Sequence, residues 1–172
     1  MPTLRDVDHC QGPLSADLLM MAYGNYQCPQ SCKAHETVNK LRDSLGDRLC
    51  FVFRHFPLEQ YPRSQKAAET AEAAASQNKF WEMHNKLFDN QQALDDASLV
   101  EYAIELGLDL SQFLQEITQG VHVERVDSDA ESGKQYGVES TPTFFISVRH
   151  QGSQNLESLV KRILVATLED DS

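Results

Sequence analysis

The sequence contains no apolar stretch long enough to cross a membrane. Its longest apolar run, Leu18 to Tyr23, has six residues, whereas a membrane-spanning helix needs about 20. The first residues, "MPTLRDVDHCQGPLSADLL", carry mixed charges and lack the continuous apolar segment of a secretory signal. These absences predict a cytoplasmic protein without a membrane partner.

Basic residues are also scarce. The chain has 15 lysines and arginines against 26 aspartates and glutamates, which gives a formal net charge of −11. Nucleic acids and anionic membranes attract clustered Lys and Arg, so we expect no nucleic-acid partner. The sequence has neither a phosphate-binding glycine loop nor the elbow motif of serine hydrolases. We therefore expect no nucleotide cofactor and no bound cofactor of another kind.

Cysteine is present at four positions, 10, 28, 32 and 50. Four cysteines in 172 residues are too few for a disulfide-stapled miniprotein. In a reducing compartment they are free thiols, metal ligands or redox groups. Cys50 lies in an apolar run and is predicted to be a small buried hydrophobe, while Cys10 has no pattern around it and is predicted to be an incidental thiol.

The length and the hydrophobic content of 41% predict one domain spanning residues 1–172. Apolar runs closed by turn residues predict buried strands, and apolar residues at helical spacing predict helices. Together they predict an α/β fold with a mixed sheet and a helical insertion at 62–136. The predicted elements are strands at 17–26, 49–55 and 141–148, helices from Cys28 to Gly46 and at 155–168, and helix hairpins within the insertion.

Cys28 is the strongest candidate for a reactive group. It directly precedes Pro29, which suits the first position of a helix because its missing N–H costs nothing there. Unpaired backbone N–H groups and the helix macrodipole stabilise a thiolate at this place, and such settings lower a cysteine pKa by several units from about 8.5. Lys33 and His35, in the first turns, are expected to add positive potential. We therefore expect Cys28 to be a nucleophile.

Several motifs together resemble the DsbA-like branch of the thioredoxin superfamily. They are "DVDHCQGPLSADLLMMAYGNYQCP", "FVFRHFPLEQYP", "AAETAEAAASQNKFWEMHNKLFDNQQAL" and "YGVESTPTFFI", and they cover almost the whole chain. The resemblance implies a thioredoxin core with a helical insertion and a redox motif at the start of the first helix. It also implies a cis Pro142 facing that motif, with backbone groups of Thr141 holding an extended substrate peptide.

The redox motif departs from the pattern of the family it resembles. Members carry Cys-Pro-x-Cys, whereas this chain reads Cys28-Pro29-Gln30-Ser31-Cys32, so Ser31 takes the position of the resolving cysteine. One residue along a helix turns the side chain by about 100°. Helical Cβ atoms four residues apart are about 5–6 Å from each other, and a disulfide needs about 3.8 Å. A Cys28–Cys32 bond would therefore need a loosened first turn.

Two mechanisms stay open from the sequence. Either Cys32 resolves a mixed disulfide formed on Cys28, or Cys28 acts alone and an external thiol resolves it, with Ser31 donating a hydrogen bond to the thiolate. The predicted catalytic residues are thus Cys28 and Cys32. The predicted substrate-binding residues are Pro29, Ser31, Thr141 and Pro142.

The leading hypothesis is a thiol–disulfide oxidoreductase or isomerase acting on protein or small-molecule thiols and disulfides. The alternative is a peptide-binding module that kept the groove at Thr141 and Pro142 and lost efficient redox chemistry. A third hypothesis is a glutathione-conjugating or isomerising enzyme, because related thioredoxin-like folds with helical insertions use a serine at this helix start. Cys28, Cys32 and His35 have no obvious fourth partner for zinc, so we expect no metal there.

Overall fold

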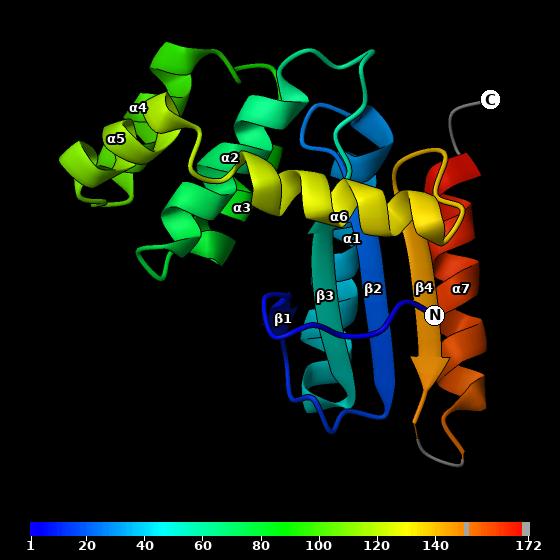
Figure 1. The fold of residues 1–172 in the computed structure, drawn as a ribbon. Coiled ribbons are helices and arrows are strands. Elements are labelled where there is room, and N and C mark those ends of the chain that lie inside the picture. Colours follow the sequence, from blue (N-terminus) through cyan, green and yellow to red (C-terminus); the bar gives the residue numbers. More distant parts are fainter. Residues whose placement is uncertain (150–151, 170–172) are drawn as a thin grey trace.

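The computed structural model describes residues 1–149 and 152–169. Its centre is a four-stranded mixed sheet with the strand order β1-β3-β2-β4 (Figure 1). The two central strands, β2 and β3, run parallel, and the outer strands β1 and β4 each run antiparallel to their neighbour. The strands are β1 (His9–Gln11), β2 (Leu18–Gly24), β3 (Leu49–His55) and β4 (Thr143–Val148).

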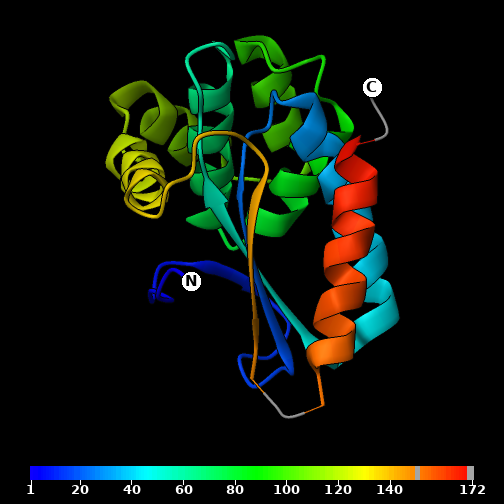
Figure 2. The same ribbon diagram turned by 90° about the vertical axis from the view of Figure 1, so that its right-hand side faces the viewer.

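Helices cover both faces of the sheet. In Figure 2, α1 and α7 lie on one face, and α6 and the N-terminal segment lie on the other. The remaining helices, α2 to α5, form a cluster beyond the end of the sheet where β2 and β3 stop (Figure 1). The helices are α1 (Pro29–Leu45), the 3-10 turn η1 (Gly46–Arg48), α2 (Ser64–Ala75), α3 (Phe80–Asp89), α4 (Asp96–Glu105), α5 (Leu110–Gln119), α6 (Val123–Gln135) and α7 (Gln154–Glu169).

Every residue of β2 and β3 is buried because both faces of these central strands are covered. Side chains alternate between two apolar clusters, as a strand requires. Met20 and Ala22 belong to the cluster under α1 and α7, which continues into the helices α2 to α5. Met21 and Tyr23 belong to the smaller cluster on the opposite face. The continuous apolar run in the sequence therefore reflects a strand buried on both sides.

The α/β architecture with a mixed sheet agrees with the prediction, and the helices α2 to α6 all lie between β3 and β4 in the chain. The predicted strands and helices appear within a few residues of the expected bounds. Strand β1 was not predicted. It has three half-buried residues, too few to form a sequence pattern, and it exists because His9, Cys10 and Gln11 pair with β3.

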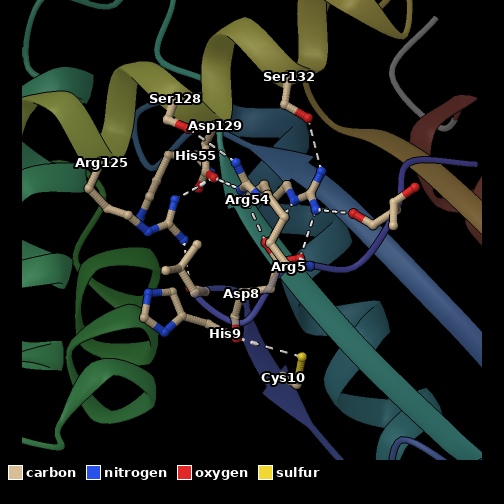
Figure 3. Close-up of polar contacts among 12 residues, drawn as sticks. Arg5, Asp8, His9, Cys10, Arg54, His55, Arg125, Ser128, Asp129 and Ser132 are labelled. Carbon is tan, nitrogen blue, oxygen red and sulfur yellow. Dashed lines mark hydrogen bonds and ion pairs between the residues drawn. The ribbon is translucent and has the colours of Figure 1, made fainter.

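Arg54 holds the N-terminal segment on the sheet (Figure 3). Its buried guanidinium donates to both carboxylate oxygens of Asp8, at 2.8 and 2.7 Å. It also donates to the hydroxyl of Tyr23 at 2.8 Å, to Ser132 at 3.0 Å and to the carbonyl of Thr3 at 2.7 Å. A guanidinium has five N–H donors, and each has an acceptor here. The charge is therefore both paired and fully hydrogen-bonded, as a buried charge must be.

Asp129, on α6, forms a second buried ionic contact beside the first (Figure 3). Its carboxylate accepts hydrogen bonds from the guanidinium groups of Arg5 and Arg125. It also accepts from the backbone N–H of His55 at 3.0 Å. One carboxylate thus joins α6, the N-terminal segment and the end of β3.

Candidate functional site

Cys28 lies at the start of α1, where the chain leaves β2. It is the N-cap residue, with an extended backbone (φ −81°, ψ 122°), and Pro29 opens the helix. Its thiol has two acceptors within hydrogen-bond distance, the carbonyl oxygen of Thr141 at 3.2 Å and the side-chain oxygen of Gln30 at 3.3 Å, and its single hydrogen can point to either one. Only 2% of Cys28 is exposed, while Gln30 is exposed. The sulfur is therefore almost inaccessible to solvent in this conformation, and the exposed side chain of Gln30 is one of the groups beside it.

The loop of Thr141 and Pro142 faces this helix start. Strand β4 begins at Thr143, opposite Tyr23 near the end of β2, because it runs antiparallel to β2. The residues just before β4 therefore lie beside the point where β2 ends and the chain continues toward α1. The Thr141–Pro142 peptide bond is cis, and the buried hydroxyl of Thr141 has no hydrogen-bond partner among the described residues. The backbone oxygen of Thr141 is bonded to the Cys28 thiol.

Ser31 and Cys32 point to different surroundings. Ser31 is buried, and its hydroxyl accepts from the backbone N–H of Asn25 at 3.3 Å. Cys32 is half-buried, and its thiol donates to the carbonyl oxygen of Phe88, at the end of α3, at 3.4 Å. Burial, followed by the carboxylates of Glu36 and Asp89, raises the pKa of the Cys32 thiol. Ser31 thus occupies the inward position behind Cys28, and Cys32 faces α3.

The first turn of α1 is regular. The backbone N–H of Cys32 donates to the carbonyl of Cys28 at 3.2 Å, which is the hydrogen bond of an ordinary α-helical turn. The loosened turn that a Cys28–Cys32 disulfide would need is therefore absent, and all four cysteines are free thiols. The sulfur atoms of Cys28 and Cys32 bond to different elements, the loop before β4 and the end of α3.

His35 does not supply the positive potential expected from the sequence. The residue is largely buried, its Nε2 bonds to the Asn39 amide at 3.1 Å, and its ring stacks on Phe88 with the ring centres 4.7 Å apart. Burial lowers the pKa of His35 below 6.5, so the ring is neutral near pH 7. The set of Cys28, Cys32 and His35 also does not converge, because each has a different hydrogen-bond partner.

Two further residues shape the site without any signal in the sequence. Gln91, just after α3, donates from Nε2 to the carbonyl oxygens of Tyr26 at 2.9 Å and of Cys28 at 2.8 Å. Burial, with a further contribution from Cys28, raises the pKa of the Tyr61 hydroxyl. Both residues lie in stretches that carry the family resemblance, Tyr61 in "FVFRHFPLEQYP" and Gln91 in the stretch that ends "NQQAL", but nothing in those stretches marks either residue as part of the site.

A small cavity of about 20 Å³ lies behind the helix start. Its lining includes Ser31, His35, His84 and Pro142 among apolar side chains. This space is just large enough for one water molecule. His84 is buried, and its Nδ1 bonds to the Tyr26 hydroxyl at 2.9 Å. The interior behind Cys28 therefore contains a few polar groups within an apolar wall.

The comparison with known families agrees with this architecture. Residues 5–164 match the family model described as thioredoxin. The chain belongs to the thioredoxin family. Solved structures share the fold over most of the chain. One is alpha-DsbA1 of Wolbachia pipientis, with a TM-score of 0.76 and 18% identity, covering 98% of this chain and 96% of that one.

Two other solved structures with a thioredoxin fold have a similar sequence identity to this chain. A thioredoxin-like oxidoreductase of Silicibacter pomeroyi has a TM-score of 0.76 and 21% identity, covering 92% of this chain and 93% of that one. BdbD of Bacillus subtilis has a TM-score of 0.67 and 19% identity, covering 91% and 92%. The chain therefore has the DsbA-like form of the thioredoxin fold, with helices α2 to α6 placed between β3 and β4.

Sequence relatives of this thioredoxin-family chain are parts of larger proteins. It is 39% identical to a Na+/H+ antiporter, NhaA 1, of Mycolicibacterium vanbaalenii, over 94% of this chain and 27% of that protein. An NhaA antiporter of Herminiimonas arsenicoxydans is 35% identical, over 98% of this chain and 26% of that protein. The chain thus spans about a quarter of the length of these relatives. Within the described residues, no helix is both long and apolar enough to cross a membrane.

Proposed function

We propose that this chain is a thiol–disulfide oxidoreductase in which Cys28 alone exchanges disulfides. The observation that carries the proposal is the contact between the Cys28 thiol and the carbonyl oxygen of Thr141, at 3.2 Å. This contact sets the sulfur against the backbone segment just before β4. Such a segment can also hold a substrate peptide by strand-like hydrogen bonds, so that the substrate's own disulfide lies beside the nucleophile.

The reaction is a pair of exchanges. The Cys28 thiolate attacks one sulfur of a substrate disulfide, a bond forms between the two sulfurs, and the other substrate sulfur leaves as a thiolate. An external thiolate then attacks the substrate sulfur of the mixed disulfide, and Cys28 leaves as a thiolate. The protein is unchanged after both steps, and the net result is an exchange of thiol partners.

Gln30 is suited to assist the first step. In the thiol form its side-chain oxygen accepts the Cys28 hydrogen, but a thiolate has no hydrogen to donate. A half turn of the amide would present the NH2 group to the sulfur instead. Because Gln30 is exposed, this rotation costs little packing.

The assignment of a single exchanging thiol depends on the first turn of α1. The Cys32 N–H is bonded to the Cys28 carbonyl, and the two thiols bond to different elements, Cys28 to the carbonyl of Thr141 and Cys32 to that of Phe88. Cβ atoms four residues apart on a helix are about 5–6 Å from each other, beyond the roughly 3.8 Å that a disulfide prefers. Ser31, in the inward position, has no sulfur to offer. A Cys28 mixed disulfide is therefore resolved from outside, which suits the proposed cytoplasmic location, where low-molecular-weight thiols are abundant.

Oxidation with glutathione disulfide followed by mass spectrometry tests the proposal. We expect one glutathione on Cys28 in the wild type and in Cys32→Ser. We expect none at position 28 in Cys28→Ser. Turnover of a glutathionylated peptide should disappear in Cys28→Ser and persist in Cys32→Ser, with Cys50→Ser as the matched control for loss of a buried thiol. Quantitative formation of an internal Cys28–Cys32 disulfide would contradict the single-thiol mechanism.

A peptide-binding module is the second candidate, favoured by the absence of a thiol at position 31. This chain matches a part of proteins that are named Na+/H+ antiporters. A membrane antiporter is therefore a candidate partner under this hypothesis. Equal peptide turnover by the wild type and Cys28→Ser, together with retained peptide binding by both, would favour the module. Loss of peptide binding in a variant of the Thr141 loop would then locate the groove.

A further inference from the structure

We propose that His9, His55 and Glu72 form a binding site for a divalent transition metal such as Zn2+, separate from the thiol site. One ligand atom from each residue lies within 4.8 Å of the other two, and no other group of three among residues 1–149 and 152–169 meets this condition. The three residues come from β1, β3 and α2, so the site exists only in the folded chain. Nothing in the sequence places these residues together.

The distances fit a metal centre after a small adjustment. Nε2 of His9 and Nε2 of His55 are each 2.8 Å from the same oxygen, Oε1 of Glu72. Zinc binds imidazole nitrogen and carboxylate oxygen at about 2.0–2.2 Å in a tetrahedral arrangement, which places neighbouring ligand atoms roughly 3.3 Å apart. Each contact would therefore lengthen by about half an ångström. The metal replaces the imidazole hydrogens that both rings direct at Glu72.

Metal binding requires the ring hydrogen of His55 to move from Nε2 to Nδ1. A ring that donates from Nε2 must carry its hydrogen on Nδ1 once Nε2 binds the metal. Nδ1 of His55 is buried and has no hydrogen-bond partner among the described residues. Moving the hydrogen to Nδ1 therefore breaks no bond at that atom, but Nδ1–H finds no acceptor there, so His55 lacks the outer-shell partner that metal-bound histidines usually have.

Packing fixes the two rings in place. The His9 ring stacks on Phe80 with the ring centres 3.5 Å apart and the planes 7° from parallel. The His55 ring packs edge-on against Phe80 and Phe53. The side chains of His55 and Glu72 are 1% and 6% exposed, whereas that of His9 is 16% exposed. The ligands are thus preorganised, and His9 provides the opening to solvent.

The ligand set determines which ions fit. Two imidazoles and one carboxylate favour Zn2+, Co2+, Ni2+ and Cu2+ over Mg2+ and Ca2+, which prefer oxygen ligands. Three protein ligands leave a position for water, as in exchangeable zinc sites. The guanidinium of Arg125 lies 3.9 Å from Oε1 of Glu72 and opposes a cation there. Removing this charge should therefore tighten binding.

Calorimetric titration of the metal-free chain of residues 1–172 with Zn2+ and Co2+ tests the site. We expect saturable binding of one ion per chain. Changes outside the ligand shell already weaken binding by about 10–100-fold, so His9→Gln, which removes a ligand, should weaken it by about 100-fold. Because His9 is at the edge of the sheet and half-buried, this variant should keep its fold, which circular dichroism checks. Arg125→Gln should bind more tightly than the wild type.

His122→Gln is the matched control. His122 also pairs with a carboxylate, with Nε2 2.6 Å from an oxygen of Glu116, but this pair is not part of a three-ligand group within the described residues. Its loss should leave binding unchanged, and so should Cys28→Ser. Absence of saturable binding, equal binding by His9→Gln, or loss of binding in Cys28→Ser would overturn the proposal, the last by assigning the ion to the thiols.

Discussion

Replacing Asp8 by Asn should destabilise the protein severely, because it leaves the buried charge of Arg54 without its partner. The side chains of Arg54 and Asp8 are 1% and 0% exposed, and Arg54 Nη2 lies 2.7 Å from the carboxylate. Asparagine keeps the shape of aspartate, so packing changes little. It removes the negative charge and turns an NH2 group toward two N–H donors. The change therefore removes the charge and part of the hydrogen bonding while it leaves the packing nearly unchanged.

The magnitude follows from the burial of the pair. Breaking a buried ion pair by removing one partner costs about 3–5 kcal/mol. For a chain of this length, each kcal/mol shifts Tm by about 2–4 °C, so Asp8→Asn should lower Tm by about 6–20 °C. Because the carboxylate accepts two of the five Arg54 hydrogen bonds, the N-terminal segment should also detach first, which hydrogen exchange at β1 would detect.

Urea and thermal unfolding of the wild type, Asp8→Asn and Asp17→Asn provide the assay. Asp17 is the matched control, since it pairs with Arg48 at 3.0 Å, but the side chains of Arg48 and Asp17 are 55% and 30% exposed. Exposed pairs contribute at most about 1 kcal/mol, so Asp17→Asn should unfold almost like the wild type. Equal effects of the two substitutions would refute the reasoning that burial makes the Arg54 contact important.

Three further predictions concern pH, packing and the site. Burial alone would raise the pKa of Asp8, but hydrogen bonds from Arg54 and Arg5 hold it below its ordinary 3.8. The stabilising contribution of the Asp8 carboxylate is therefore present above about pH 4 and is lost as the pH falls through its folded-state pKa. Unfolding measured at several pH values should show that the free energy of unfolding decreases less on acidification in Asp8→Asn than in the wild type. Gly133→Ala should destabilise the protein by up to about 2 kcal/mol. Overpacking costs about 1–3 kcal/mol, and the higher helix propensity of alanine offsets about 1 kcal/mol of that. A Cβ there would lie 2.6 Å from the Phe56 ring, and a gain in Tm, or a loss equal to that of the exposed Asp127→Ala, would contradict this. Gln91→Ala removes two hydrogen bonds to the loop before α1, so it should cost about 1–3 kcal/mol and slow thiol exchange, whereas the exposed neighbour Gln92→Ala should do neither.

Much of the core architecture was predictable because it is encoded locally. Apolar runs marked β2 and β3, and Pro29 followed by helical spacing marked α1, whose N-cap is Cys28. The presence of Ser31 at the resolving position was also visible in the sequence, together with its geometric consequence for Cys32. Strand β1 was not predictable, because three residues form no pattern and gain their structure only by pairing with β3.

The roles of Gln91 and Tyr61 could not be predicted for a related reason. Both lie in stretches that carry the family resemblance, but their contact with the helix start depends on how the loop after β3 and the end of α3 pack. The expectation for His35 was wrong because its charge depends on burial, which lowers the pKa. A sequence shows that a histidine is present in the first turns of a helix, but it does not show which neighbours exclude water from the ring.

The sequence by itself determined the family, the order along the chain of the main elements β2, α1, β3, β4 and α7, and the presence of one cysteine at a helix start, since these depend on residues near one another in the chain. Only the tertiary structure decided which distant groups meet. Cys28 and Thr141 are 113 positions apart, and His9 and Glu72 are 63 apart. Such contacts arise from sheet pairing and helix packing, whose free energy is shared among many residues. No single stretch of sequence therefore encodes them.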